Sequence, residues 1–245
     1  MNFLGRSFNE EPLAQVCAGL LARAEGEAFA YVVTPNADHL GRLHRNPALR
    51  PIYDEALLRL FDSRFLAHFV RLLGQEPPPV ITGADLIAAL LPELGASRVA
   101  VVGMQPAAFA MLQQRFPLID FIHHNPPMNL LAKPEAFAEA AHFVAMAKAR
   151  FTFFALGSPV QELLAHEVLR QGQAAGLGLC IGAALEFQAG TRRRAPFWMQ
   201  RAGLEWLHRL AAEPRRLGSR YLLRAPRVMV LLLARPSGFR AGSNQ

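Results

Sequence analysis

RVAVVGMQPAAFAMLQQRFPLIDFIHH, residues 98–124, holds the pattern that decides the fold of this chain. Its first six residues form a short apolar run that predicts a buried strand, and residues 119–123 form another. Between them, residues 106–116 predict a helix that begins at Pro106, a residue well suited to a first helical turn. A strand, a helix and a strand of these lengths predict a right-handed βαβ unit with parallel strands.

The same alternation continues on both sides of this stretch. Toward the C-terminus it predicts helices at 134–148 and 159–174 and strands at 151–157 and 178–184. Toward the N-terminus it predicts a strand at 29–33, an apolar run at 57–61, and helices at 11–25, from about 37, at 65–73 and at 82–91. We therefore expect an α/β fold, with two Rossmann-like parallel-sheet halves in one compact unit and a helical, basic C-terminal appendage. The expected boundaries are 1–189 for the core, with halves of about 1–95 and 96–189, 190–235 for the appendage and 236–245 for a loose tail.

Basic residues are concentrated at the C-terminal end. From Gly190 onward the chain has twelve arginines and two glutamates, a balance of +10, whereas residues 1–189 have fourteen basic and seventeen acidic residues, a balance of −3. Such a segment suits a phosphorylated small molecule, an anionic lipid surface or nucleic acid. Nucleic acid is the least favoured, because the basic residues are not interleaved with the aromatic side chains of a stacking platform.

One helix is predicted within the appendage, from Pro196 to Pro214. Apolar residues recur at helical spacing along it and predict a docking stripe, formed by Trp198, Leu204, Leu207 and Leu210. A second face carries Arg201, Glu205 and Arg209, four residues apart, the spacing of supporting ion pairs. Arginines flank the helix at both ends, and their guanidinium groups suit bidentate phosphate recognition; they include Arg194, Arg216 and Arg220. A solvated basic helix that binds no ligand remains the alternative.

Composition and missing motifs exclude several classes of protein. The content of 52% apolar and 18% charged residues is that of a globular protein. Two distant cysteines argue against a disulfide framework, and neither a signal peptide nor a membrane-spanning segment is expected. The chain lacks the glycine-rich nucleotide-binding motifs, the Asp-x-Asp clamp and the G-x-S-x-G elbow. His123 and His124 would point to opposite faces of a strand, so no metal and no cofactor are predicted.

Ligands of open α/β sheets bind at the carboxyl ends of the strands, and this rule selects four loops. The loops are Thr34-Pro35-Asn36, Asp62-Ser63, Gly103-Met104-Gln105 and Gly157-Ser158-Pro159-Val160-Gln161-Glu162. Asp62 follows an apolar run and is a candidate general base, although it could instead cap a helix that begins near Arg64.

The other polar residues of these loops also have two interpretations. Gln161 and Glu162 begin a helix, where N–H groups suit a phosphate or a sugar hydroxyl, but Glu162 could simply complement the helix dipole. Thr34 and Asn36 offer a hydroxyl and an amide to a ligand, but both are also ordinary turn formers.

In their order along the chain, these segments resemble the WecG/TagA/CpsF glycosyltransferases, from about Val32 to Leu222. Residues 34–36 resemble the T-P-N segment of that family, and 60–63 fall where the family has an Asp-Gly pair with its proposed base. Residues 82–86 resemble its G-x-D-L segment, which adds Asp85 to the candidate site, and 157–162 resemble G-x-P-K-Q-E. Spaced matches between Ala189 and Tyr221 resemble its C-terminal signature.

The resemblance implies an inverting, metal-independent glycosyltransferase that moves a sugar from a UDP-sugar to a polyprenyl-diphosphate-linked saccharide, in exopolysaccharide or cell-wall polymer synthesis. Asp62 would take the proton of the acceptor hydroxyl, and arginines would stabilise the departing diphosphate: Arg194, Arg216 and Arg220. The remaining substrate-binding residues would be Thr34, Asn36, Asp85, Gly103, Gln161 and Glu162. The enzyme would be cytoplasmic and peripheral on the inner face of the cytoplasmic membrane. A homo-oligomer and the identity of the sugar are left open.

Several positions depart from the family pattern. Ser63 replaces the glycine after the aspartate, Val80 stands where an arginine is usual, and Val160 replaces a lysine. The loss of two cations should weaken leaving-group stabilisation unless other arginines compensate. A catalytically degenerate member that acts as a membrane-docking or scaffolding partner in polysaccharide assembly is therefore the alternative function.

Overall fold

A single six-stranded parallel sheet forms the centre of the computed structural model, which describes residues 2–3, 6–212, 214, 218, 229 and 239–240. The strand order is β4-β3-β8-β7-β5-β6, and every neighbouring pair is parallel. The strands are β3 (Ala30–Val33), β4 (Leu58–Arg59), β5 (Arg98–Gly103), β6 (Asp120–His124), β7 (Phe151–Ala155) and β8 (Leu177–Cys180). The predicted α/β class is confirmed, and strands from both expected halves share this sheet because β3 pairs with β8.

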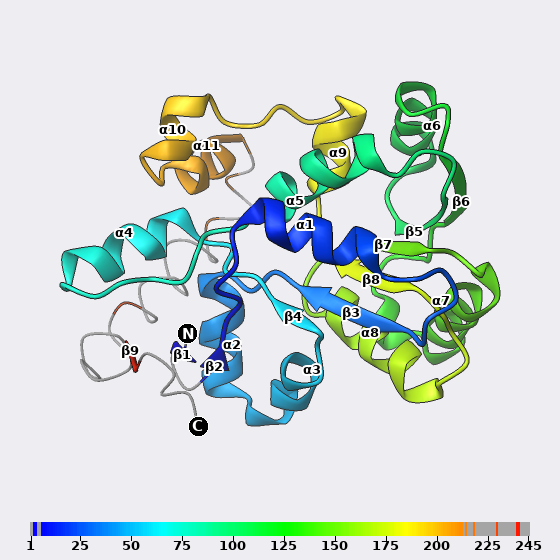
Figure 1. Ribbon diagram of the computed structural model, residues 1–245, viewed down its shortest axis with the longest axis horizontal. Coiled ribbons are helices and arrows are strands. Elements are labelled where there is room, and N and C mark those ends of the chain that lie inside the picture. Colours follow the sequence, from blue (N-terminus) through cyan, green and yellow to red (C-terminus); the bar gives the residue numbers. More distant parts are fainter. Residues whose placement is uncertain are drawn as a thin grey trace.

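Helices cover both faces of the sheet (Figure 1). On one face lie α1 (Leu13–Ala22), α5 (Gly83–Leu90), α6 (Pro106–Arg115) and α9 (Ala184–Ala189). On the other face lie α2 (Ala37–Arg45), α3 (Arg50–Asp54), α7 (Pro134–Ala147) and α8 (Val160–Gln171). Successive side chains of a strand point to opposite faces, so Val101 packs in the first core and Val102 in the second. This burial on both faces explains why the strands are apolar almost throughout.

Short elements complete the fold. Three 3₁₀ turns connect larger elements: η1 (Pro47–Leu49), η2 (Leu91–Glu93) and η3 (Leu130–Ala132). A small antiparallel sheet in the order β2-β1-β9 joins the two ends of the described chain, with strands β1 (Asn2–Phe3), β2 (Arg6–Ser7) and β9 (Phe239–Arg240). β9 belongs to the segment expected to be loose, and the rest of that segment lies outside the described residues.

Three of the helices that begin at the carboxyl edge of the sheet have a side-chain cap. The Asn36 side chain accepts the Asp38 N–H at the start of α2 (3.1 Å). Ser63 accepts the Leu66 N–H (3.2 Å) at the start of α4 (Arg64–Leu72), and Thr82 accepts the Asp85 N–H (3.0 Å) at the start of α5. Capping satisfies N–H groups that have no partner within the helix, so these sequences determine where each helix starts.

The helix predicted between Pro196 and Pro214 is wrong in one respect, because the chain forms two helices there, α10 (Phe197–Arg201) and α11 (Glu205–Ala212). Gly203 separates them with a φ of +72°, a left-handed conformation that favours glycine. A Cβ atom at this position would lie 2.7 Å from His68 Cδ2 and 3.2 Å from the Phe65 backbone. The close approach of this turn to α4 therefore ends the first helix, a tertiary contact that helical periodicity does not reveal.

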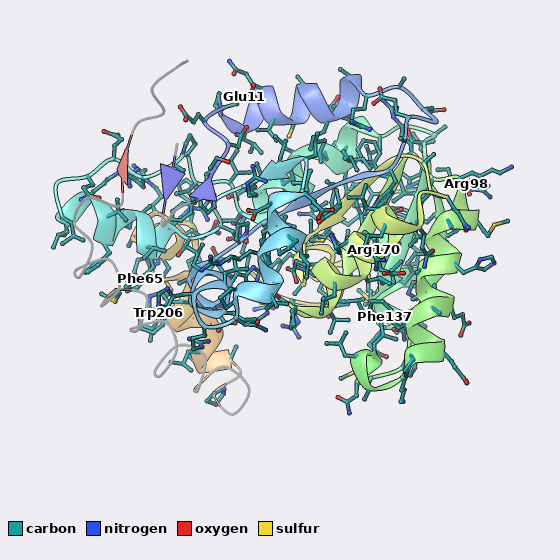
Figure 2. The ribbon with its side chains drawn as sticks, turned by 90° about the horizontal axis from the view of Figure 1, so that it is seen from below. Glu11, Phe65, Arg98, Phe137, Arg170 and Trp206 are labelled. Atoms are coloured by element: carbon teal, nitrogen blue, oxygen red, sulfur yellow. The ribbon has the colours of Figure 1, made fainter. Side chains whose placement is uncertain are left out.

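The predicted docking stripe is wrong at two of its four positions, and the Arg209 side chain of the predicted ion pairs lies outside what the structure describes. Trp198 is 64% exposed and Leu207 is 43% exposed, so these two side chains are not buried against the core of the protein. Instead the Trp206 ring lies 5.8 Å from the Phe65 ring of α4. Both side chains are labelled in Figure 2. Arg201 lies over the Phe197 ring, and Glu205 pairs with arginines of other segments. The described part of the chain has no helix with the length and apolar character needed to cross a membrane.

Candidate functional site

The loops selected from the sequence follow neighbouring strands at one edge of the sheet. The chain leaves β3 toward α2 on one face and leaves the adjacent β8 toward α9 on the other face (Figure 1). A neighbouring pair of strands whose connections leave in opposite directions marks the place where open α/β sheets bind ligands.

Thr34 and Asn36 organise the loop after β3. Thr34 is buried, and its hydroxyl donates to the Cys180 carbonyl (3.0 Å), which ties this loop to the end of β8. Asn36 is half-buried and uses its side-chain oxygen to cap α2. Both residues thus hold the backbone of this edge in place.

Asp62 follows β4 by three residues and is half-buried. Its N–H donates to the Pro35 carbonyl (3.1 Å), and its Oδ2 accepts the Gly83 N–H (3.3 Å) at the start of α5. The α4 helix that follows is capped by Ser63, so Asp62 is not the N-cap of that helix and instead accepts an N–H of the first turn of α5. The carboxylate therefore faces the N-terminus of α5 instead of its own helix.

Asp85 belongs to the first turn of α5 and forms a charged cluster with Arg64, Arg194 and Glu205. Its carboxylate pairs with Arg64 (2.5 Å) and Arg194 (2.8 Å) and accepts the Thr82 hydroxyl (2.8 Å). Burial alone would raise the pKa of Asp85, but Arg194, Thr82 and Arg64 outweigh it and hold the pKa below its usual range. Asp85 is thus an ionised anchor for two guanidinium groups.

Gln161 and Glu162 lie below the edge, at the start of α8. They are only 3% and 1% exposed. The Gln161 amide donates to Glu162 Oε1 (2.8 Å), and its oxygen accepts the Gly182 N–H (2.9 Å) in the loop after β8. Burial raises the pKa of Glu162 despite hydrogen bonds from Gln161 and Ser158. The pair therefore braces the loop after β8 from within the protein.

These residues are linked by contacts at Gly83. A Cβ atom on Gly83 would lie 3.3 Å from the Ile181 carbonyl oxygen and 3.6 Å from Thr34 Oγ1. The Gly83 N–H binds Asp62, and Gly83 itself lies against the loop after β8 that Gln161 braces. The structure brings together candidates from the loops after β3, β4 and β7, around the loop that follows β8.

Gly103 lies further along the edge, at the end of β5. It has a φ of +94°, and a Cβ atom there would lie 2.8 Å from the Ala155 carbonyl oxygen, so only glycine fits. Its own carbonyl accepts a hydrogen bond from the His123 ring (2.8 Å). Gly103 therefore packs closely against the end of β7. The two other predicted binding residues, Arg216 and Arg220, lie outside the described residues.

Sequence reasoning missed four polar residues at this edge. Arg64, two residues after Asp62 in the chain, pairs with the carboxylate of Asp85. Arg42 binds Asp38 and Ser158 (both 2.9 Å), and His39 Nδ1 lies 3.9 Å from Glu162 Oε1. The i,i+4 spacing of Asp38 and Arg42 is the one local signal that could have identified part of this group.

Among the departures from the family pattern, Val80 forms a parallel bridge with Phe61, so position 80 lies beside the end of the chain segment that carries Asp62. Within the part of the chain that the structure describes, no three His, Cys, Asp or Glu side chains are grouped to hold a metal ion.

The chain belongs to the glycosyl transferase WecG/TagA/CpsF family, whose model matches residues 1–241. The match includes the sheet, all the loops described above and the C-terminal segment with α10 and α11. The protein is thus a glycosyltransferase, an enzyme that takes a nucleotide-sugar donor and an acceptor.

Proposed function

We propose that this glycosyltransferase moves one sugar from a UDP-sugar to a polyprenyl-diphosphate-linked saccharide in the synthesis of an exopolysaccharide or a cell-wall polymer. An acceptor hydroxyl attacks the anomeric carbon of the donor as its proton passes to Asp62. The new C–O bond forms while the bond from the anomeric carbon to the diphosphate breaks, with inversion and without a metal ion. The nucleotide leaves as its diphosphate, whose developing charge must be stabilised by preorganised donors.

One observation carries the assignment of the base. Asp62 is a half-buried carboxylate at the carboxyl edge of the sheet, oriented by the Gly83 N–H (3.3 Å) and not used to cap its own helix. A general base must be positioned within hydrogen-bonding reach of the proton that it accepts. A carboxylate whose orientation is set by a neighbouring helix, at the ligand-binding edge, suits this role.

Arginines suit the departing diphosphate, since a guanidinium group can bind phosphate oxygens in a bidentate manner. Arg194 lies beside the first turn of α5 and donates to the Thr82 hydroxyl (3.3 Å), next to the residue that holds Asp62. Arg216 and Arg220 would join it from beyond the described residues. Thr34, Asn36, Gly103, Gln161 and Glu162 would shape the edge that receives the nucleotide.

The exposed surface of the C-terminal segment supports docking on a membrane. Phe197 is 72% exposed beside the exposed Trp198, and exposed Arg193 and Arg201 flank them. Aromatic side chains favour the headgroup region of a bilayer, and arginines favour its anionic lipids. We propose that this surface places the enzyme on the inner face of the cytoplasmic membrane, where a polyprenyl-linked acceptor is reached.

The test is transfer by the purified full chain. It would be incubated with a panel of UDP-hexoses and UDP-N-acetylhexosamines and a short-chain polyprenyl-diphosphate saccharide, and the products weighed by mass spectrometry. A mass gain of one sugar on the acceptor is expected with one member of the panel, and it should disappear when the acceptor lacks its terminal saccharide. Absence of transfer with every donor would contradict the proposal.

A second function is favoured by Val80 and Val160, which replace two cations of the family pattern. In that function the chain is a catalytically degenerate scaffold of a polysaccharide assembly complex. It would bind anionic vesicles like the enzyme, but it would neither transfer nor hydrolyse any UDP-sugar. The donor panel described above therefore distinguishes the two functions, because only the enzyme transfers a sugar in it.

A further inference from the structure

Two arginines from distant segments share one carboxylate. Arg64 Nη2 lies 2.5 Å from Asp85 Oδ2, and Arg194 Nη2 lies 2.8 Å from Asp85 Oδ1. All three side chains are only about one-fifth to one-quarter exposed. Asp85 thus holds two guanidinium groups side by side at the start of α5, and it neutralises one of their two charges.

Glu205, the first residue of α11, supplies the second negative charge, but its contacts are long. Arg64 Nη1 lies 3.5 Å from Glu205 Oε2, and Arg194 Nε lies 3.6 Å from Glu205 Oε1. Charge-assisted hydrogen bonds between these groups are normally about 2.7–2.9 Å long. Arg194 Nε is buried and has no hydrogen-bond partner among the described residues. The guanidinium pair therefore has donor capacity that Glu205 does not fill.

Local structure makes Glu205 the member that can leave. A carboxylate at the start of a helix is stabilised by the helix dipole, so Glu205 would keep a favourable environment at the N-terminus of α11 without the arginines. Arg64 has the opposite preference, because it is a cation at the start of α4 and needs an anion beside it. The arginine pair thus requires a second anion, whereas Glu205 does not require the arginines.

We propose that Arg64 and Arg194 form a diphosphate site that Glu205 occupies at rest and that the substrate's diphosphate takes over. This inference rests on the proposed function, and it adds Arg64 as a binding residue and Glu205 as a displaceable internal carboxylate. Asp85 remains bound and keeps the two guanidinium groups together. Displacement of Glu205 also releases one contact between α11 and the core, so binding of the diphosphate is coupled to the position of the C-terminal segment.

The experiment measures binding by calorimetry with three probes: inorganic pyrophosphate for the shared chemistry, UDP for a nucleotide source and farnesyl diphosphate for a lipid source. The full chain is compared with Glu205→Gln, Arg64→Gln and the control Glu167→Gln. Glu167 pairs with Arg170 (3.2 Å) on α8, so the control makes the same change in net charge at an arginine elsewhere. Thermal unfolding of each variant establishes that it is folded.

Glu205→Gln is expected to bind pyrophosphate about three- to tenfold more tightly, since it removes a partly exposed competing ion pair. Arg64→Gln is expected to bind it about tenfold or more weakly, and Glu167→Gln as the wild type does. Tightening with UDP but not farnesyl diphosphate identifies the donor as the source, and the reverse identifies the acceptor. Should Glu205→Gln weaken or leave unchanged the binding of pyrophosphate, or should no variant bind it, the inference is overturned.

The proposed function can fail separately. Suppose that Glu205→Gln binds pyrophosphate more tightly but the full chain transfers no sugar from any donor. The inference of a diphosphate site would then stand, and the proposed transfer reaction would be contradicted. If Glu205→Gln unfolds, Arg64→Gln and Arg64→Lys still decide, since loss of pyrophosphate binding without Arg64 and its partial rescue by lysine are both required.

Discussion

Asp62→Asn is the most direct test of the proposed mechanism. The amide has nearly the shape of the carboxylate, and its oxygen can still accept the Gly83 N–H that Asp62 Oδ2 accepts at 3.3 Å. Because this hydrogen bond is long, removing the negative charge of Asp62 should weaken it by no more than about 1 kcal/mol. An amide cannot accept the proton of the acceptor hydroxyl, however, and loss of a general base typically lowers the rate by about 10²–10⁴-fold. In free energy of activation this is roughly 2.7–5.5 kcal/mol, so the chemical effect should dominate the structural one.

The assay is steady-state release of UDP with the donor and acceptor that give transfer, together with calorimetric binding of UDP. We expect kcat to fall by the factor above, while the affinity for UDP changes less than about threefold. Asp120→Asn is the matched control, because Asp120 pairs with Arg98 at the opposite, amino end of β6. Full turnover by Asp62→Asn would refute the assignment of the base, and an equal loss of UDP affinity would make Asp62 a binding residue instead.

Four further predictions concern the stability of the protein and its independence of a metal ion. Asp85→Asn should lower the free energy of unfolding by about 1–3 kcal/mol at pH 7, because it leaves two guanidinium groups without their shared carboxylate. Since the pKa of Asp85 lies below its usual range, this loss should shrink in urea denaturation as the pH falls below about 4, and a pH-independent loss would contradict it. Burial raises the pKa of Glu162, so its ionisation opposes folding as the pH rises above its unfolded value of about 4.3. Glu162→Gln should therefore gain stability relative to the wild type as the pH rises above about 4.3, and a stability difference that stays constant with pH would count against this. Gly203→Ala should destabilise the protein by at least about 1–2 kcal/mol in thermal unfolding, because of its left-handed φ and because the new Cβ would lie 2.7 Å from His68 Cδ2; an unchanged midpoint would mean that the turn can rearrange. EDTA should leave the rate of transfer unchanged, and a strict need for Mg²⁺ or Mn²⁺ would rule out metal-independent transfer.

Much of the fold could be predicted from the sequence, because each element of the sheet carries its own signal. The apolar run at residues 98–103 and the helix that begins at Pro106 occur where they were predicted. Both signals are local, since they depend on strand and helix periodicity and on a proline at the first turn. The prediction of a single helix in the C-terminal segment was wrong, because the break between α10 and α11 at Gly203 depends on contact with α4, which is far away in the sequence.

The candidate site could be predicted in outline only. The rule for the carboxyl ends of strands selected the loops of Thr34, Asp62 and Gln161, and the structure links these loops through Gly83. The same rule did not show that Gln161 is buried as a brace. It also missed Arg64, because a basic residue at a helix start has no local partner that would mark it.

By itself, the sequence determined the alternation of strands and helices, the helix caps and the loops where ligand chemistry is placed, because each of these depends on residues within a few positions of one another. Only the tertiary structure decided that Arg64 and Arg194, 130 residues apart in the chain, meet on Asp85 beside Glu205. The physical reason is that an arginine attracts any carboxylate within reach. Which carboxylate is within reach depends on how β4, α5 and the C-terminal segment pack, and that packing is set by contacts between distant parts of the chain.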